Sequence, residues 1–322
     1  MKMARWLVLI AALCAAGALH AQGNYPNRPL RLIIPWPPGQ ATDLVGRVLA
    51  QRFTELLGQP VIADNRPGAG GTIGTDQAAR AAADGYTILA ASSGPVTIAP
   101  LLQKVPYDAE RQLAPVALVG RSPYLLVTAP SFPAANAREF VALLKANPGK
   151  YTFSSSGAGA SAHLITEWFN INAGIQAVHV PFKGSAQAMT EVMTAQISYT
   201  LETAAATLPH IKAGKLKAYG VSIAKGTTLA PAIPSLAAAA DLPGYDAAAW
   251  IGVMVAAGTP KPLVDRLAAA TDKVMQSADT RERLNLVGIE VDYRPADEFG
   301  RYLAEQKARF ADIIKRGNIR IE

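Results

Sequence analysis

The chain has 322 residues, half of them hydrophobic, a formal net charge of +7 and a single cysteine. This length exceeds what one hydrophobic core ordinarily holds, so we expect two lobes. The basic residues are spread along the chain without a long basic run, which argues against nucleic-acid binding. A mild positive balance is compatible with an anionic small ligand.

The N-terminal segment has the pattern of a secretory signal peptide. Lys2 and Arg5 precede a short apolar run at residues 6–16, and small residues follow as far as Ala21. The run is shorter than the roughly 20 apolar residues that span a bilayer, so we expect cleavage after Ala21 rather than a membrane anchor. Since Cys14 lies in this segment, the mature chain lacks a thiol for a disulfide or a thiolate metal site. The sequence therefore predicts a periplasmic protein from which residues 1–21 are removed.

Strands and helices alternate along the first third of the chain. The first helix is expected between an N-cap at Thr42 or Asp43 and a stop at Gly58, because apolar residues recur there at helical spacing. Strands are expected on either side of this helix and again after a second one, at residues 30–34, 61–62 and 86–90. This order is typical of an α/β lobe with a largely parallel sheet.

The same alternation continues through the rest of the chain. Apolar residues 115–130 are expected to cross from the first lobe to the second, and residues 216–223 to return. We therefore expect lobe 1 to comprise residues 22–123 and 223–322, and lobe 2 to comprise residues 124–222. Further helices are expected at residues 136–146, 162–172 and 295–316, and further strands at residues 151–153 and 177–182.

Twice a strand ends in a glycine-rich loop that opens a helix, at residues 65–74 and 154–161. Glycine lets backbone N–H groups approach a ligand closely, and a helix N-terminus adds partial positive charge and unpaired donors. Such junctions share one edge of a parallel sheet. We therefore expect the junctions at residues 38–43, 68–71, 155–161 and 182–185 to hold a small anion such as a carboxylate together.

The sequence contains no complete motif for nucleotide binding, for serine hydrolysis or for metal binding. Neither glycine loop ends in the Gly-Lys-Ser/Thr of a P-loop, and His179 stands where a dinucleotide site would place an acidic residue. There is no G-x-S-x-G elbow, and a hydrolase that uses Ser161 and His163 is the enzymatic alternative. His163 is otherwise expected to pack or cap near the start of its helix. The histidine and acidic residues show no metal-ligand spacing, so we expect neither a metal nor a cofactor.

Short motifs spread along nearly the whole chain match one family. Among them are Pro35-Trp36-Pro37-Pro38-Gly39, Asn65-Arg66-Pro67-Gly68-Ala69-Gly70-Gly71, Asp84-Gly85-Tyr86-Thr87, Ser156-Gly157-Ala158-Gly159, His179-Val180-Pro181-Phe182-Lys183-Gly184 and Ala257-Gly258-Thr259-Pro260. Each motif is weak alone, but their order and spacing together are specific. The chain resembles the Bug-type extracytoplasmic solute receptors, the periplasmic binding components of tripartite tricarboxylate transporters.

The resemblance implies an α/β, two-lobed periplasmic binding protein fold of type II, with each lobe a mainly parallel sheet flanked by helices and a ligand cleft between the lobes. Receptors of this family hold carboxylates through backbone and hydroxyl donors and bridging waters, with little help from charged side chains. Carried onto this sequence, the ligand-binding residues of lobe 1 are Pro38, Gly39, Gln40, Ala41, Thr42, Asp43, Gly68, Ala69, Gly70, Ser92 and Ser93. Those of lobe 2 are Ser155, Ser156, Gly157, Ser161, His163, Phe182 and Lys183.

Three residues depart from the family pattern. Gln40 stands where glycine is usually repeated, so a long amide side chain is expected at the floor of the cleft. Phe182 replaces the more usual tyrosine and removes a hydroxyl. Glu202 stands in a stretch that usually contains an aspartate. If Glu202 lines the cleft, it favours a ligand with an amine or hydroxyl group or repels a second carboxylate; a solvated or capping role is the alternative.

We therefore predict a non-catalytic, monomeric receptor for a small organic carboxylate, such as a di- or tricarboxylate, an amino acid or an aromatic acid. The receptor is expected to deliver this ligand to the membrane subunits of a transporter, and no nucleic-acid partner is expected. A sensor subunit that passes the ligand-bound state to a signalling partner is the alternative of another class, because both roles need the same closure of the lobes.

Overall fold

Ten strands of the described residues, 25–320, form one sheet in this computed structural model. Their order is β2-β1-β3-β9-β4-β7-β5-β6, and β8 and β10 also pair with β4. The predicted signal peptide, residues 1–21, lies outside the described residues. The strands are β1 (Leu30–Ile34), β2 (Val61–Asn65), β3 (Thr87–Ser92), β4 (Leu113–Thr128), β5 (Thr152–Ser155), β6 (Val178–Pro181), β7 (Tyr199–Thr203), β8 (Lys217–Val221), β9 (Ala248–Ala256) and β10 (Glu290–Pro295).

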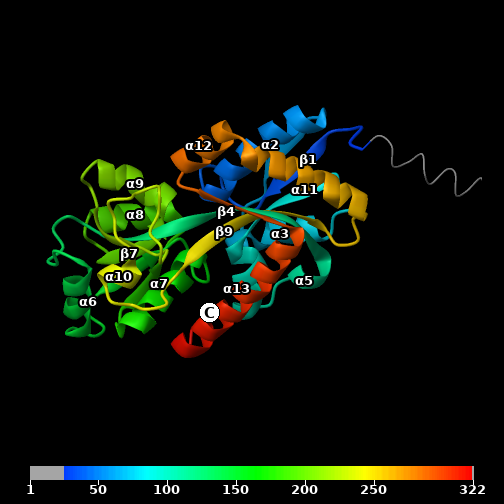
Figure 1. Cartoon of the computed structure of the whole chain (residues 1–322). Helices are drawn as coiled ribbons and strands as arrows, with labels where there is room; N and C mark the ends of the chain where they lie inside the picture. Colours follow the sequence, from blue (N-terminus) through cyan, green and yellow to red (C-terminus); the bar gives the residue numbers. More distant parts are fainter. Residues whose placement is uncertain (1–24, 321–322) are drawn as a thin grey trace, which may run out of the picture.

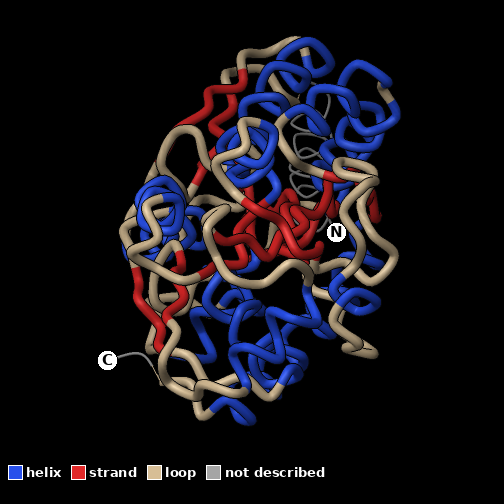
Figure 2. The backbone as a smooth tube through the Cα atoms, turned by 90° about the vertical axis from the view of Figure 1, so that its left-hand side faces the viewer, coloured by secondary structure: helices blue, strands red, loops and turns tan. Residues whose placement is uncertain are grey.

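Helices cover the sheet from outside, as Figure 2 shows with helices around a central group of strands. In Figure 1, α2, α11 and α12 lie on one side of the strands, and α3, α5 and α13 lie on the other. Among residues 25–320, no helix combines the length and apolar character needed to cross a bilayer. The helical segments are α2 (Ala41–Leu57), η1 (Ala69–Gly71), α3 (Thr72–Ala79), η2 (Gly94–Ile98), α4 (Ala99–Leu102), α5 (Ala109–Gln112), α6 (Ala137–Lys145), α7 (Ser161–Ala173), α8 (Ser185–Met193), α9 (Ala204–Lys212), α10 (Leu236–Ala239), α11 (Lys261–Gln276), α12 (Ala278–Leu286) and α13 (Ala296–Gly317).

The long strand β4 belongs to both halves of the molecule. Its first part, as far as Pro123, pairs antiparallel with β9. From Tyr124 onward it pairs antiparallel with β7, in the other half. On either side of this shared strand the neighbouring strands run parallel: β1 with β2 and β3 in one half, and β5 with β6 and β7 in the other. The halves are therefore joined through β4, and the crossing falls within the run that the sequence predicted to cross.

The return from the second half to the first comes later in the chain than the sequence predicted. Residues from 223 onward were assigned to lobe 1, but Leu236, Leu242 and Tyr245 lie in the same apolar cluster as Phe140 and Phe169. The Tyr245 hydroxyl also donates a hydrogen bond to the Ile165 carbonyl at 3.2 Å. The segment 236–247 therefore packs on the second half, because its apolar side chains complete that core. Strand β9 then leads back to the first half.

Local signals placed the first elements well, apart from one helix cap. The strand predicted at residues 30–34 is confirmed as β1, and Gly58 ends α2 in the left-handed conformation. The predicted N-cap at Thr42 or Asp43 is wrong, since the cap residue is Gln40, without a capping side-chain bond. Instead, Asp43 Oδ2 accepts a hydrogen bond from the Gly39 N–H at 2.8 Å. This carboxylate therefore fixes the loop that precedes the helix.

A small apolar cluster connects the two halves on the side of α13. Ile98 from η2 and Phe310 and Ile313 from α13 pack with Leu164 from α7. Figure 1 shows α13 running from below the first half toward α7. The Arg309 guanidinium also lies 5.3 Å from the centre of a Trp168 ring. These contacts hold the halves in the arrangement described here.

Gly252 of β9 provides a test of the core packing. A Cβ atom there would lie 2.5 Å from Phe299 Cζ and 2.9 Å from the Ala117 carbonyl oxygen. Because Phe299 is fully buried against Trp250, the ring has no room to move away. We expect Gly252→Ala to lower the free energy of unfolding by about 1–3 kcal/mol in denaturant titrations.

Gly300→Ala is the control for this variant. It also adds one methyl group, but its nearest neighbour, Pro115 Cγ, lies 3.9 Å from the new atom. The residue lies within α13, so alanine is expected to leave stability unchanged or to raise it by up to about 1 kcal/mol. Equal stabilities for Gly252→Ala and Gly300→Ala would contradict the packing described for β9.

Candidate functional site

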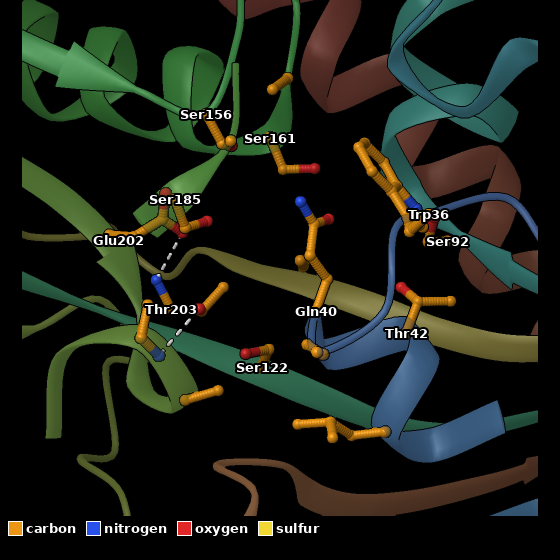
Figure 3. A pocket seen from close by; sticks show the side chains of 18 of the residues that line it. Trp36, Gln40, Thr42, Ser92, Ser122, Ser156, Ser161, Ser185, Glu202 and Thr203 are labelled. Carbon is orange, nitrogen blue, oxygen red and sulfur yellow. Dashed lines mark hydrogen bonds between the residues drawn. The ribbon is translucent and has the colours of Figure 1, made fainter. Parts of the chain in front are cut away.

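A cleft of about 680 Å³ lies between the two halves. Its floor is formed by β4 and β9, which contribute Ser122, Tyr124 and Trp250. Figure 3 shows Trp36, Gln40, Thr42 and Ser92 on one side of Ser122 and Ser185, Glu202 and Thr203 on the other, with Ser156 and Ser161 above. The other lining residues are Pro37, Pro38, Gly39, Ala41, Leu44, Ser93, Gly94, Ala160, Lys183, Gly184, Ala186, Met189, Ala205, Ala206, Pro209, His210, Ala249, Ile251, Leu286 and Val287.

The N-termini of several helices reach the cleft lining. The first residues of α2, α7 and α8 are Ala41, Ser161 and Ser185, and all three line the cleft. None of these three helices has a side-chain hydrogen bond at its N-cap. Backbone N–H groups in the first turn of a helix lack partners within the helix, and they carry partial positive charge. The cleft is therefore suited to an anion that accepts hydrogen bonds from these groups.

Hydroxyl groups supply further hydrogen-bonding capacity. Ser93 Oγ and Ser161 Oγ lie 2.9 Å apart, and their hydrogen bond connects the two halves. Trp36 Nε1 donates to Ser92 Oγ at 2.8 Å and fixes the indole ring beside the cleft. Ser122 Oγ is buried at the floor and has no hydrogen-bond partner among the described residues. The lining thus offers hydroxyl groups from both halves and from the strand between them.

Glu202 is the acidic residue of the cleft lining. Its side chain lies at the end of β7, and the residue is only 1% exposed. Oε1 accepts a hydrogen bond from the Thr203 N–H at 2.8 Å, whereas Oε2 has no partner among the described residues. Burial raises the pKa of Glu202 above its ordinary value of 4.5, although the Thr203 N–H and the Ser185 hydroxyl lower it in part. The carboxyl group therefore has one free oxygen at the cleft.

The two halves approach each other closely around the cleft. The Gln40 side chain extends from the first half toward the second (Figure 3), and its Nε2 would lie 3.5 Å from a Cβ atom placed on Gly184. On another side, a Cβ atom at Gly288 would lie 2.3 Å from the Ala205 backbone nitrogen. Ala205 belongs to α9 of the second half, whereas Gly288 precedes β10 of the first. The structure is therefore a closed form.

Many of the residues predicted to bind ligand lie together in this cleft. They are Pro38, Gly39, Gln40, Ala41, Thr42, Ser92, Ser93, Ser156, Ser161, Lys183 and Glu202. Gln40 and Glu202, whose positions the sequence left open, are both in the lining. That these residues contact a ligand stays a prediction.

The first glycine loop lies behind the lining rather than in it. Gly68, Ala69 and Gly70 are absent from the lining, as is Asp43. A Cβ atom at the neighbouring Gly71 would lie 3.4 Å from Trp36 Cε2. Because Gly71 also has φ +90°, glycine is favoured there for the turn as well as for the approach to the indole. The loop therefore supports Trp36 from behind, and that it contacts a ligand directly stays a prediction.

Ser155 and His163 also lie behind the lining, together with Gly157 and Phe182. Ser155 Oγ lies 2.7 Å from His179 Nε2, and the His163 ring stacks on the His179 ring with centroids 3.8 Å apart. Burial lowers the pKa of His163 to about 3 and that of His179 to about 4, so both rings are neutral at physiological pH. His163 therefore packs against His179, and that it contacts a ligand stays a prediction.

The structure does not pair Ser161 with His163 as a nucleophile and its base. Ser161 Oγ is bonded to Ser93, whereas His163 Nδ1 accepts from the Gly159 N–H at 3.1 Å. The hydrolase alternative needs a serine hydroxyl within hydrogen-bond reach of a histidine at the cleft. Among residues 25–320, no group of three or more histidine, cysteine or acidic side chains is arranged to hold a metal ion.

Six polar or aromatic lining residues were not among the predicted site residues: Trp36, Ser122, Tyr124, Thr203, His210 and Trp250. Ser185 was predicted only as part of the junction at residues 182–185. Ser185 follows the Gly184 junction, and Thr203 caps α9 by accepting from the Ala206 N–H. Helix-start signals could therefore have found both. Ser122 is a polar residue within an apolar strand, which is a weaker signal. The position of Trp36 depends on tertiary packing.

Two α/β halves that share a strand and enclose a cleft at their helix N-termini define the periplasmic binding protein fold. The chain belongs to the tripartite tricarboxylate transporter family of receptors, whose family model matches residues 45–319. This membership confirms the family resemblance and the fold class predicted from the sequence motifs.

Relatives of known sequence and of known structure align with nearly the whole chain. Protein BugT of Bordetella pertussis is 34% identical over 320 residues, which cover 98% of each chain. The solved structure of R. palustris Rpa4515 with adipate has a TM-score of 0.85 and 28% identity, covering 92% of this chain and 99% of that one. MatC from Rhodopseudomonas palustris with bound malate has a TM-score of 0.80 and 28% identity, covering 90% and 100%.

Glu202→Gln is expected to stabilise the ligand-free protein at neutral pH. The pKa of Glu202 is raised in the folded state, so its ionised form costs stability at every pH above that raised value. The cost falls as the pH drops and is absent below the ordinary pKa of 4.5. The amide keeps an oxygen for the Thr203 N–H. Thermal unfolding should therefore show a higher melting temperature for Glu202→Gln near neutral pH and a shrinking difference toward acidic pH.

Glu305→Gln serves as the control, because it removes the same charge from an exposed position on α13. We expect its melting temperature to follow that of the unmodified protein at each pH. A Glu202→Gln variant that is no more stable than Glu305→Gln near neutral pH would contradict the buried environment described for Glu202.

Proposed function

We propose that this protein is a periplasmic receptor that binds a small organic carboxylate in the cleft and delivers it to the membrane subunits of a tripartite transporter. The observation that carries this proposal is that the N-termini of α2 and α7 reach one cleft without a side-chain cap. Their N–H groups, with nearby serine hydroxyls, can bind a carboxylate without an arginine. Lys183 lies at the exposed rim.

The relatives support a carboxylate as the ligand. Rpa4515 was solved with adipate and MatC with bound malate, and this chain covers almost all of both structures. The two ligands share carboxylate groups and differ in length and in their other substituents. We therefore carry over the ligand class to this chain and not the particular ligand.

Closure of the two halves would report the bound state. Gln40 and Ser93 from the first half and Ser161 from the second meet at the cleft, so only a closed form presents donors from both halves to one ligand. The membrane subunits would distinguish this closed form from an open one. We propose no catalytic step, because Ser161 is paired with Ser93 and lacks a histidine base.

Thermal-shift screening and calorimetry of the mature protein test this function. The panel contains mono-, di- and tricarboxylates, aromatic acids and amino acids, with the corresponding amides and esters as neutral controls. A ligand at a hundredfold excess over its Kd should stabilise the protein by about 2.7 kcal/mol. Binding of a carboxylate but not of its amide supports the proposal. Preference for neutral or cationic compounds, or turnover of an ester, would overturn it.

Gly288→Ala tests the link between closure and binding. The new Cβ atom would meet the Ala205 backbone in the form described here, and opening of the halves would relieve this contact. An overpacking cost of about 1–3 kcal/mol on closure corresponds to a loss of affinity of about fivefold to 150-fold. Calorimetry with the tightest carboxylate of the panel measures this loss.

Gly58→Ala is the matched control for Gly288→Ala. Gly58 has φ +72° and Gly288 has φ +77°, so alanine strains both backbones similarly, but a Cβ atom at Gly58 meets nothing within 4 Å. We expect similar losses of stability in the two variants and weaker ligand binding only in Gly288→Ala. If both variants bind as tightly as the unmodified protein, binding does not require the closed form described here.

A further inference from the structure

Glu202 Oε2 forms no hydrogen bond within the folded chain among the described residues, although the Ser185 hydroxyl lies near the same carboxyl group. Glu202 is 1% exposed, and its Oε2 has no hydrogen-bond partner among the described residues. An unpaired polar atom in such a position costs free energy, so buried polar groups normally have partners. Because the side chain lines the cleft, a molecule bound there can supply the missing donor.

The surroundings of Glu202 favour its role as an acceptor. Thr203, its neighbour, caps α9, and Ser185 begins α8, so two helix N-termini lie beside the carboxyl group (Figure 3). The partial positive charge of helix N-termini favours an anion. Here the protein's own carboxyl group occupies that position. No lysine or arginine among the described residues forms an ion pair with Glu202 in the cleft.

The polar groups of the cleft therefore fall into two sets. Ser156 and Ser161 lie at the α7 end, where that helix begins, and Glu202 lies below them beside Ser185, with the Gln40 side chain to one side of both sets (Figure 3). A ligand carboxylate fits the α7 end, since no protein carboxylate lies there. A second ligand carboxylate placed at Glu202 would set two like charges together in a partly dehydrated site, where their repulsion is strong.

We propose that Glu202 is a specificity-determining residue, which selects a carboxylate whose second polar group donates hydrogen bonds, an ammonium or a hydroxyl group, over a dicarboxylate. This inference rests on the proposed function, that the cleft binds a carboxylate. It narrows that ligand class, because a second carboxylate group would lack the donor that Oε2 needs. The ammonium and hydroxyl groups share the required chemistry, and the experiment separates them.

Calorimetry with matched ligands tests this proposal. One series contains butyrate, γ-aminobutyrate, γ-hydroxybutyrate and glutarate, which differ in the group at the far end of the chain. A second series contains benzoate, its para-aminomethyl and para-hydroxymethyl derivatives, and terephthalate. In at least one series, we expect the amino or hydroxy compound to bind about tenfold more tightly than the plain acid, and the dicarboxylate to bind more weakly than that compound.

The Glu202→Gln variant tests whether this side chain causes the preference for the amino or hydroxy compound. We expect it to lose about tenfold in affinity for the preferred amino or hydroxy compound and to gain affinity for the dicarboxylate, while the plain acid binds as before. Glu305→Gln, exposed on α13, should keep the unmodified ranking. Circular dichroism and the melting temperature show that each variant is folded.

The outcomes separate failure of this inference from failure of the proposed function. If the dicarboxylate binds most tightly, or if Glu202→Gln keeps the unmodified ranking, the role of Glu202 is refuted while carboxylate binding stands. If no carboxylate of either series or of the wider screening panel binds, the proposed function fails and this inference fails with it.

Discussion

The structure depends on one strand, β4, that is shared by two halves of a sheet. Because β4 pairs with β9 along its first part and with β7 further on, the parallel strands of both halves end around the same cleft. The chain leaves β1, β3, β5, β6 and β7 at that cleft, and helices begin there. The convergence of uncapped helix N-termini follows from this topology, and with it the preference for an anion.

Sequence patterns identified the strand-to-helix junctions but not which side chains face the ligand. Strand β1 and the end of α2 were predicted from local signals, since β-branched residues and Gly58 act within a few positions of themselves. The first glycine loop was expected at the ligand because glycine lets backbone N–H groups approach closely, and His163 because the family resemblance implies it. In the structure the loop approaches Trp36 and the His163 ring stacks on His179, and both partners come from other segments of the chain. Local sequence does not encode such packing.

The limited reach of local sequence signals also explains why the chain returns from the second half to the first later than the sequence predicted. The sequence predicts a loop-rich stretch at residues 224–245, because Pro231, Pro234 and Pro243 interrupt it, yet Leu236 and Tyr245 are fully buried in the second core. Their apolar side chains decide which half they join, and no local signal shows which core has room for them. By contrast, Glu202 was predicted to matter because it departs from the family pattern. The structure shows in addition that this side chain is buried and that its Oε2 has no hydrogen-bond partner among the described residues.

Some polar groups at the cleft are not satisfied by the chain itself. Ser122 Oγ and Glu202 Oε2 have no partners among the described residues, and the first turns of α7 and α8 lack side-chain caps. Proteins commonly sacrifice some stability at binding sites, where a ligand restores the missing interactions. The unsatisfied groups therefore describe the complement of the ligand: an acceptor for the helix N-termini and a donor for Glu202.

A crystal structure of the mature protein with its tightest-binding carboxylate tests the central claim most directly. The account predicts a closed form in which the ligand carboxylate accepts hydrogen bonds from the first turn of α7 and from Ser156 or Ser161, directly or through one water. A carboxylate held by Lys183 at the rim, or bound outside the cleft, would contradict the account.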